Sequence, residues 1–158
     1  MNRTQRRTQI IQACLRLQQQ VASTAKTEMD SCQQQSNEYG ANVDRYDAYR
    51  TKLMRQRDMY AKQLSNANAS IRVLQELLRV APMNVADHGA IVITNKQKFF
   101  MSLGVGKFMV PYQTPDSVPQ EVFFAISAQT PIYMALRGSH VGDSITFNGQ
   151  SQIIEDIL

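Results

Sequence analysis

SNEYGANVDRYD, residues 36–47, separates two long segments that contain neither glycine nor proline. Residues 1–39 lack both, and residues 41–81 lack both up to Pro82. Gly40 can adopt positive φ without a Cβ clash, and asparagine also tolerates this conformation, so the stretch is typical of a chain reversal. We therefore expect two helices of about thirty residues, each roughly 45 Å long, that fold back on each other.

Apolar or small residues recur three or four positions apart on both sides of this stretch. The stripe before it consists of Ile10, Cys14, Leu17, Val21 and Ala25, and the one after it of Tyr46, Leu53, Tyr60, Leu64, Ala67, Ile71, Leu74 and Leu78. This spacing predicts two amphipathic helices packed as an antiparallel coiled coil. We expect Thr8 to cap the first helix after a frayed segment over residues 1–7, and Pro82 to end the second helix.

The second half of the chain has a different composition. All five prolines and all but one of the seven glycines lie from Pro82 onward. Strands are expected at residues 89–94, 98–106, 121–127, 144–147 and 152–158, with a loop at 111–119 and a short helix at 131–137. Asn148 and Gly149 favour a type I′ turn between the last two strands. The predicted fold class is α+β, with a helical hairpin over residues 1–81 and a small domain over 82–158.

Charge is distributed unevenly along the chain, whose formal net charge is +4. Residues 1–82 carry 13 Lys and Arg against 7 Asp and Glu, whereas residues 83–158 carry 4 against 6. A basic half favours an acidic partner, either nucleic acid or an acidic protein surface. The alternative is a solvated charged face of a long helix.

The two cysteines and the two histidines give no sign of a disulfide or a metal site. Cys14 and Cys32 lie on one predicted helix about 27 Å apart, which is too far for them to pair. Free thiols are typical of a reducing compartment, so we expect a cytoplasmic protein without a membrane partner. His88 and His140 stand alone, and no cluster has metal-ligand spacing, so no cofactor of its own is expected.

The last forty residues carry a pattern of prolines, glycines and apolar residues. It runs through Ile126 and Ser127, Thr130 to Ile132, Ala135 and Leu136, Gly138, and Val141 to Asp143, followed by Gly149 and the strand at Ile153 and Ile154. This pattern resembles the C-terminal part of bacterial Gre-type transcript cleavage factors, with Tyr133 where that family usually has glycine. The resemblance implies a coiled-coil hairpin followed by an FKBP-like domain, which is the architecture expected here.

The start of the second predicted helix also resembles this family. Val43 to Asp47 (VDRYD) is similar to a GDKYE tip found in relatives of the Bacteroidetes type. The resemblance implies a monomeric factor that is not itself an enzyme and that binds bacterial RNA polymerase beside its secondary channel. The hairpin would enter the channel, meet the RNA 3′ end only indirectly, and promote cleavage of backtracked RNA.

The resemblance also implies which residues act. Asp44 and Asp47 have the D-x-x-[DE] spacing of the family's tip carboxylates, which help hold the second Mg²⁺ of the polymerase active site. Oxygen ligands suit Mg²⁺, and a second metal activates water and stabilises the departing oxygen. Contacts with the partner are expected from Glu38, Arg45, Pro131, Tyr133 and Gly138.

Several alternatives stay open. Acids at a helix start also satisfy the helix dipole without any metal. Aligning residues 37–39 with the family's NAEY would put Cys32 and Gln35 at the acidic positions and predict a channel regulator that does not cleave. An FKBP-type prolyl isomerase or chaperone would need an aromatic cavity, whereas sheet packing explains the aromatic residues Phe99, Phe100, Phe123, Phe124 and Tyr133. A coiled-coil assembly module would form a dimer rather than a monomer.

Overall fold

A computed structural model describes residues 2–38, 44–111 and 120–158, and for residues 44–46 only the backbone. The chain forms two long helices, then a mixed sheet with one short helix. It divides into two compact units, which we call the hairpin unit (residues 16–72) and the sheet unit (residues 1–15 with 73–158). The predicted boundary between residues 81 and 82 lies where helical sequence changes to strand sequence. The sheet unit of the structure also includes the beginning of the first long helix and the end of the second.

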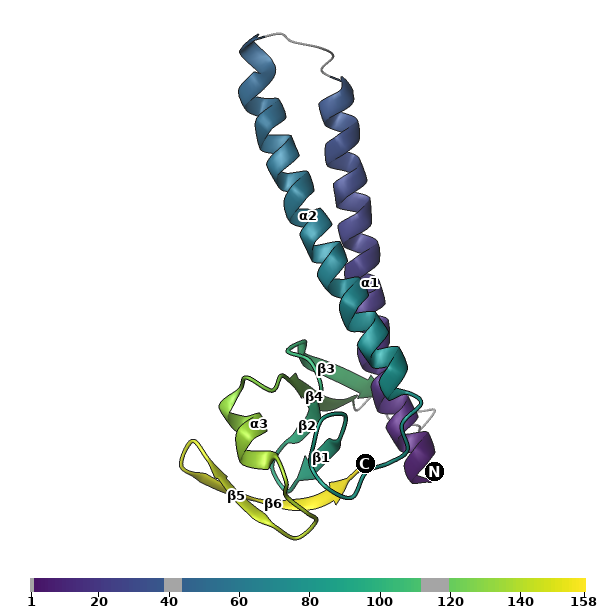
Figure 1. Cartoon of the computed structure of the whole chain (residues 1–158), viewed down its shortest axis with the longest axis vertical. Helices are drawn as coiled ribbons and strands as arrows, with labels where there is room; N and C mark the ends of the chain where they lie inside the picture. Colours follow the sequence, from purple (N-terminus) through teal and green to yellow (C-terminus); the bar gives the residue numbers. More distant parts are fainter. Residues whose placement is uncertain (1, 39–43, 112–119) are drawn as a thin grey trace. The chain divides into compact units, whose positions relative to one another are not determined.

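The hairpin unit consists of α1 (Arg3–Glu38) and α2 (Asp44–Leu77), apart from the helix ends nearest the sheet. The two helices run side by side in opposite directions (Figure 1). Ala22, Ala25, Leu53 and Ala67 are buried in the seam between them, whereas Val21 of the predicted stripe is 40% exposed. The predicted helical hairpin is therefore confirmed, with a seam built mainly from small side chains.

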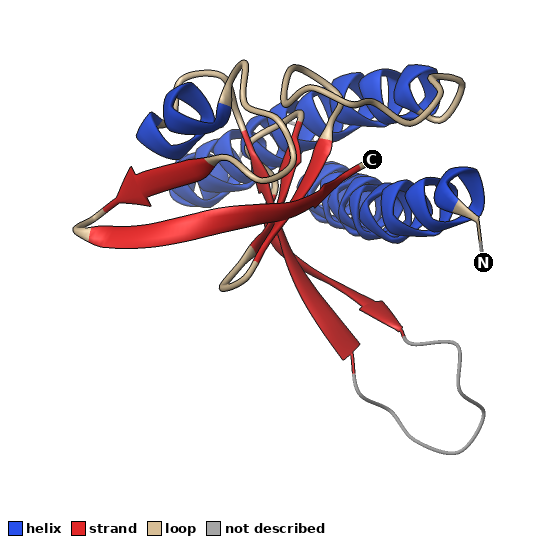
Figure 2. Ribbon diagram, turned by 90° about the horizontal axis from the view of Figure 1, so that it is seen from below, coloured by secondary structure: helices blue, strands red, loops and turns tan. Residues whose placement is uncertain are grey.

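The sheet unit contains six strands in the order β3-β4-β2-β1-β6-β5. Their bounds are β1 (Ile91–Thr94), β2 (Lys98–Met101), β3 (Gly106–Pro111), β4 (Gln120–Ile126), β5 (Ser144–Phe147) and β6 (Gln150–Ile157). Only the β2–β4 pair is parallel, and the β3–β4 and β5–β6 ribbons extend from the middle of the sheet (Figure 2). The fold class is therefore α+β, as the sequence predicted, and the structure adds that the sheet is mixed.

The short helix α3 (Pro131–Leu136) packs on one face of the sheet. A buried cluster joins it to side chains from β1, β2, β4 and β6, and its members include Val92, Phe99, Ile126, Ile132, Tyr133, Leu136 and Ile154. Side chains alternate between the two faces of a strand, so Phe100 points to the opposite face from Phe99. On that second face Phe100, Phe108 and Phe123 form a row of ring contacts, with centroids 6.4 and 5.7 Å apart.

The beginning of α1 belongs to this second face, which corrects the expectation of a frayed N-terminal segment. The helix starts at Arg3 rather than after Thr8. Arg7 is only 2% exposed. Its guanidinium donates hydrogen bonds to the carbonyl oxygens of Leu77 (3.2 Å), Val80 (3.0 Å), Gly89 (2.6 Å) and Leu158 (3.1 Å).

These bonds explain why a cation can be buried here. Two of the acceptors lie at or just beyond the C-terminal end of α2, where carbonyl groups lack helical partners and carry partial negative charge. Burial still lowers the pKa of Arg7, because desolvation penalises its charged form. The Arg7 contacts thus hold the start of α1, the end of α2 and the last strand together within the sheet unit.

Two element boundaries also differ from the prediction. The single strand expected at residues 98–106 is two strands, β2 and β3, and β3 continues to Pro111. In β3 the buried Phe108 and Val110 alternate with the exposed Lys107 and Met109, which is the pattern of an edge strand with one covered face. The second long helix ends at Leu77, five residues before Pro82.

The predicted turn between the last two strands is confirmed. Asn148 has φ of 51° and Gly149 has φ of 74°, so both central residues are left-handed as a type I′ turn requires. Gly89 is also left-handed, with φ of 90°. A Cβ atom there would lie 2.8 Å from Cδ2 of Leu77, so a larger residue would disturb the same region that binds Arg7.

Candidate functional site

The predicted tip carboxylates lie at the start of the second long helix. The helix α2 begins at Asp44, so Asp44 and Asp47 occupy its first turn, three residues apart on one helix face. The Asp47 side chain is exposed. The expected placement of the pair at a helix start is therefore confirmed, while the side chains of Asp44 and Arg45 and all of residues 39–43 lie outside the described residues.

Glu38 brings a third carboxylate to this end of the hairpin. It is the last residue of α1, and its side chain is exposed. Asp44 is six positions further along the chain, so the two Cα atoms are at most about 22 Å apart. The described ends of both helices therefore present acidic side chains where the hairpin reverses.

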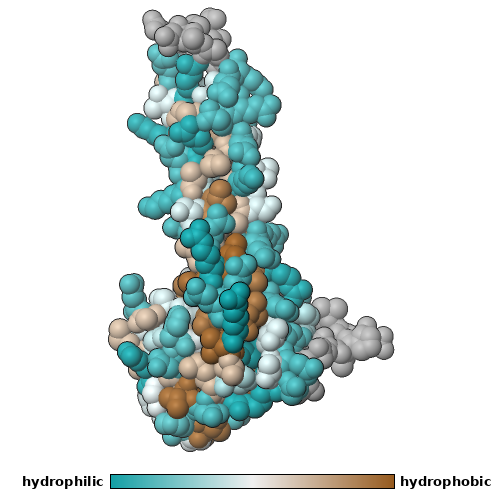
Figure 3. All heavy atoms as spheres, turned by 45° about the vertical axis from the view of Figure 1, so that its right-hand side comes forward, coloured by the Kyte–Doolittle hydropathy of each residue, from teal (hydrophilic) through white to brown (hydrophobic). Residues whose placement is uncertain are grey.

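Charge on the outer part of the hairpin differs between its two helices. Residues 26–38 of α1 carry one basic and three acidic side chains, whereas residues 44–63 of α2 carry six basic and three acidic ones. Figure 3 shows that the visible face of the hairpin is mostly hydrophilic toward this end. A nucleic acid or an acidic protein surface would thus be attracted to α2 rather than to α1.

One of these basic side chains is engaged inside the hairpin. Arg57 donates a hydrogen bond of 2.6 Å from Nη1 to Oε1 of Gln33 on α1, and it pairs with Asp58 at 2.9 Å. Cys32 lies next to this contact, with its Sγ 4.0 Å from Oε1 of Gln56. Polar side chains therefore link the two helices where larger apolar residues would be expected in a coiled coil.

The predicted partner contacts on α3 divide into exposed and buried residues. Pro131 is exposed at the first turn, and Gly138 is exposed with φ of 81° and open space around it. Tyr133 is only 4% exposed, and burial raises the pKa of its hydroxyl, with Asp87 acting in the same direction. Tyr133 is thus a core residue rather than the exposed partner contact expected from the sequence, because its ring fills the space between α3 and the sheet.

Exposed apolar residues next to α3 were not found by sequence reasoning. Met134 is 65% exposed and Val141 54% exposed. The loop before β1 is bonded to the residues after α3, because Ala86 accepts a hydrogen bond from Gly138 at 2.7 Å and donates one to Ser139 at 2.9 Å. Isolated apolar residues have no periodicity, so their exposure is seen only in the fold. We call Pro131, Met134, Gly138 and Val141 the α3 surface.

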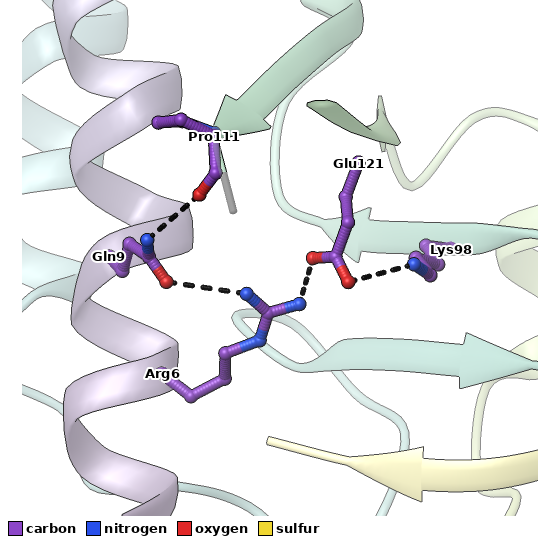
Figure 4. Close-up of polar contacts among 5 residues, drawn as sticks. All are labelled: Arg6, Gln9, Lys98, Pro111 and Glu121. Carbon is purple, nitrogen blue, oxygen red and sulfur yellow. Dashed lines mark hydrogen bonds and ion pairs between the residues drawn. The ribbon is translucent and has the colours of Figure 1, made fainter. Parts of the chain in front are cut away.

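A second group of residues missed by sequence reasoning is polar and lies on the other face of the sheet (Figure 4). Glu121 of β4 is 8% exposed and pairs with Arg6 of α1 and with Lys98 of β2, the latter at 3.1 Å. Both cations also lie over the Phe123 ring, at 6.0 and 5.6 Å from its centroid. Gln9 bonds to the Pro111 carbonyl at 3.1 Å. These contacts attach α1 to the sheet within the sheet unit.

Cys14 and Cys32 are both buried and unpaired. Burial raises the pKa of the Cys14 thiol to about 12, so this residue remains protonated near neutral pH. Within residues 2–38, 44–111 and 120–158, no group of three or more His, Cys, Asp or Glu side chains is arranged to hold a metal ion. In the same part of the chain, no helix is long and apolar enough to cross a membrane.

Comparisons with protein-family models, with curated proteins and with solved structures found no match to this chain. Two surfaces are candidates: the acidic end of the hairpin and the α3 surface of the sheet unit.

Proposed function

We propose that this chain is a Gre-like transcription elongation factor of bacterial RNA polymerase. In this proposal the sheet unit is an FKBP-like domain that binds near the secondary channel, and the hairpin enters the channel to promote cleavage of backtracked RNA. One observation carries the proposal: an antiparallel hairpin of helices of 36 and 34 residues bears the Asp44 and Asp47 pair in the first turn of its second helix.

The hairpin suits a site that lies deep inside a partner. The described part of α1 within the hairpin unit, residues 16–38, is about 35 Å long at the rise of an α-helix. Two packed helices are only about 20 Å across, because each has a diameter of about 10 Å with its side chains. Such an element reaches into a channel that a globular domain cannot enter.

The residues at its end suit assistance to a metal-dependent reaction. Asp47 is exposed, and carboxylate oxygens are ligands that Mg²⁺ prefers. In the proposal Asp44 and Asp47 help hold an ion that belongs to the polymerase, and that ion activates water for phosphodiester hydrolysis. The chain itself then needs no resident metal and no active site, and it acts by supplying oxygen ligands at the right place.

The α3 surface is the proposed docking surface of the sheet unit. It combines exposed Met134 and Val141 with Pro131, and Arg137 lies beside it in contact with Asp87 at 3.8 Å. A small apolar patch with charges at its rim is typical of a transient protein interface. A prolyl isomerase is less well supported, because Phe99 and Tyr133 are each 4% exposed in the packed core and line no open cavity.

A channel regulator without cleavage activity is the second candidate. One observation favours it: Asp47 is one methylene shorter than the glutamate of the family pattern, so its oxygens reach less far. The alignment that would place Cys32 at an acidic position is disfavoured, because Cys32 is 7% exposed in the helical seam and cannot present a ligand to a metal there.

The test is RNA cleavage by a stalled, backtracked polymerase from the same organism. The wild-type chain is compared with the Asp44→Ala/Asp47→Ala variant and with Asp30→Ala, which removes an exposed acid elsewhere on α1. We expect wild type and Asp30→Ala to stimulate cleavage, and the double variant to bind polymerase without stimulating it. Binding by wild type without cleavage would favour the regulator, and absence of binding would refute both candidates.

A further inference from the structure

The seam between the two long helices becomes steadily poorer in large apolar side chains. At the helix ends that belong to the sheet unit, Ile10, Ile11, Leu74 and Leu77 are 0–6% exposed. The part of the hairpin unit that follows buries Ala22, Ala25 and Ala67 instead. Each alanine buries far less apolar area than a leucine, so it contributes less to holding the helices together.

The seam is weakest in what we call the outer hairpin, residues 26–38 and 44–63. Among its described side chains, only Cys32, Ser36 and Leu53 are buried, and Leu53 alone is large and apolar. The polar contacts there add little, since water competes for the hydrogen bond between Gln33 and Arg57, and Arg57 is 34% exposed.

The helices of the outer hairpin also depend on each other. In proteins most helical stability comes from the packing of an amphipathic face, and these two segments bury few side chains. Loss of the seam contacts therefore removes the helical structure as well. The sheet unit does not depend on these residues, because its buried side chains come from residues 1–15 and 73–158.

We propose that the outer hairpin opens and closes as a separate unit while the sheet unit stays folded. Opening stops at the inner end of the outer hairpin. The buried alanines come next in the seam, and the buried isoleucines and leucines follow them. Local opening lets the outer hairpin adjust its shape to a partner while the sheet unit stays folded. It does not depend on the identity of that partner or on the proposed function.

Hydrogen–deuterium exchange of the full chain, followed by mass spectrometry, tests whether the outer hairpin opens separately. We expect amides of residues 26–38 and 47–63 to exchange about tenfold faster or more than those of residues 8–14, residues 73–77 and the central strands. Equal protection of the outer hairpin and the strands would overturn the proposal, because it would mean that both open only in global unfolding.

Two matched substitutions sharpen the test. Leu53→Ala removes the single large buried side chain, and Met59→Ala shortens a side chain of the same helix that is 48% exposed. We expect Leu53→Ala to accelerate exchange in both segments of the outer hairpin by about tenfold, with the strands unchanged and with little effect from Met59→Ala. Equal acceleration in the strands would show one cooperative unit and refute the proposal.

A third substitution works in the opposite direction. Ser36→Leu adds apolar surface at a buried seam position, and Ser23→Leu makes the same change at an exposed position of α1. We expect slower exchange of the outer hairpin in Ser36→Leu only. Unchanged exchange in both Ser36→Leu and Leu53→Ala would overturn the proposal, since the seam would then not control opening.

Discussion

The sheet unit buries an arginine, whereas the described side chains that the hairpin unit buries are mainly alanines, with Leu53, Cys32, Ser36 and Gln18. Arg7 of α1 is enclosed because the end of α2 and the residues after it, the loop before β1 and the residue after β6 supply four carbonyl acceptors. Two helices alone have no third layer to enclose a side chain of that size. One chain thus combines a densely packed domain with an arm whose seam consists mainly of small and polar side chains.

The largest expected effect concerns the buried cation. Arg7→Met removes the guanidinium donors for four carbonyl groups. Leu77 and Leu158 keep backbone donors from Val80 and Ile91, whereas the carbonyls of Val80 and Gly89 lose the hydrogen bond that satisfies them inside the sheet unit. We expect the free energy of unfolding to fall by about 3–5 kcal/mol, which chemical denaturation followed by circular dichroism measures.

Arg79→Met is the matched control for this substitution. Arg79 is exposed, so the same change of side chain should alter stability by less than about 0.5 kcal/mol. A loss of similar size in both variants would mean that overall charge, and not the buried contacts, stabilises the sheet unit.

The same leucine-to-alanine substitution, made once in each unit, compares how much global stability each unit loses. Leu74 is 0% exposed in the sheet unit and Leu53 is 4% exposed in the hairpin unit. Leu74→Ala should cost about 2–5 kcal/mol of global stability, because it leaves a cavity in a packed core. Leu53→Ala should cost less than about 1 kcal/mol of global stability, because the outer hairpin opens before global unfolding and the loss appears as faster local exchange instead. Equal losses in thermal unfolding would remove the distinction between the units.

Much of the fold could be predicted from local patterns. The two long helices, their apolar stripes and the turn at Asn148 and Gly149 are each decided by a few neighbouring residues, while Gly40 itself lies outside the described residues. The buried Arg7 could not be predicted, because arginine is rarely buried and its acceptors are 70 to 151 residues away in sequence. The strand β3 was missed because Gly106 and Pro111 at its ends resemble loop residues.

The candidate site was predictable to a similar extent. The start of α2 at Asp44 followed from acidic residues after a turn, which is a local signal. Tyr133 was expected both as a partner contact and among the aromatic residues that sheet packing explains, and it is buried by packing with strands from both ends of the domain. Met134 and Val141 are exposed apolar residues without a repeating spacing, so no sequence pattern marks them.

The smallest expected effect concerns the thiol of Cys14, which the sheet unit keeps out of water. Its pKa is about 12 in the folded chain, against an ordinary value of 9.0. Between these values the unfolded chain loses the proton first, so ionisation favours unfolding and stability falls as pH rises from about 9 to 12. At pH 10.5 this loss should amount to about 1–2 kcal/mol relative to pH 8.

The Cys14→Ala variant should lack that part of the decline, whereas Cys32→Ala should retain it. The fall in unfolding free energy from pH 8 to pH 10.5 is measured for each variant, and the difference between the two falls gives the Cys14 contribution. Lysines and tyrosines also titrate in this range, but they do so in both variants and cancel in the comparison. If the unfolding free energy of Cys14→Ala fell as steeply with pH as that of Cys32→Ala, the Cys14 thiol would not be shielded from water in the folded chain. The start of α1 would then be no better packed than the outer hairpin.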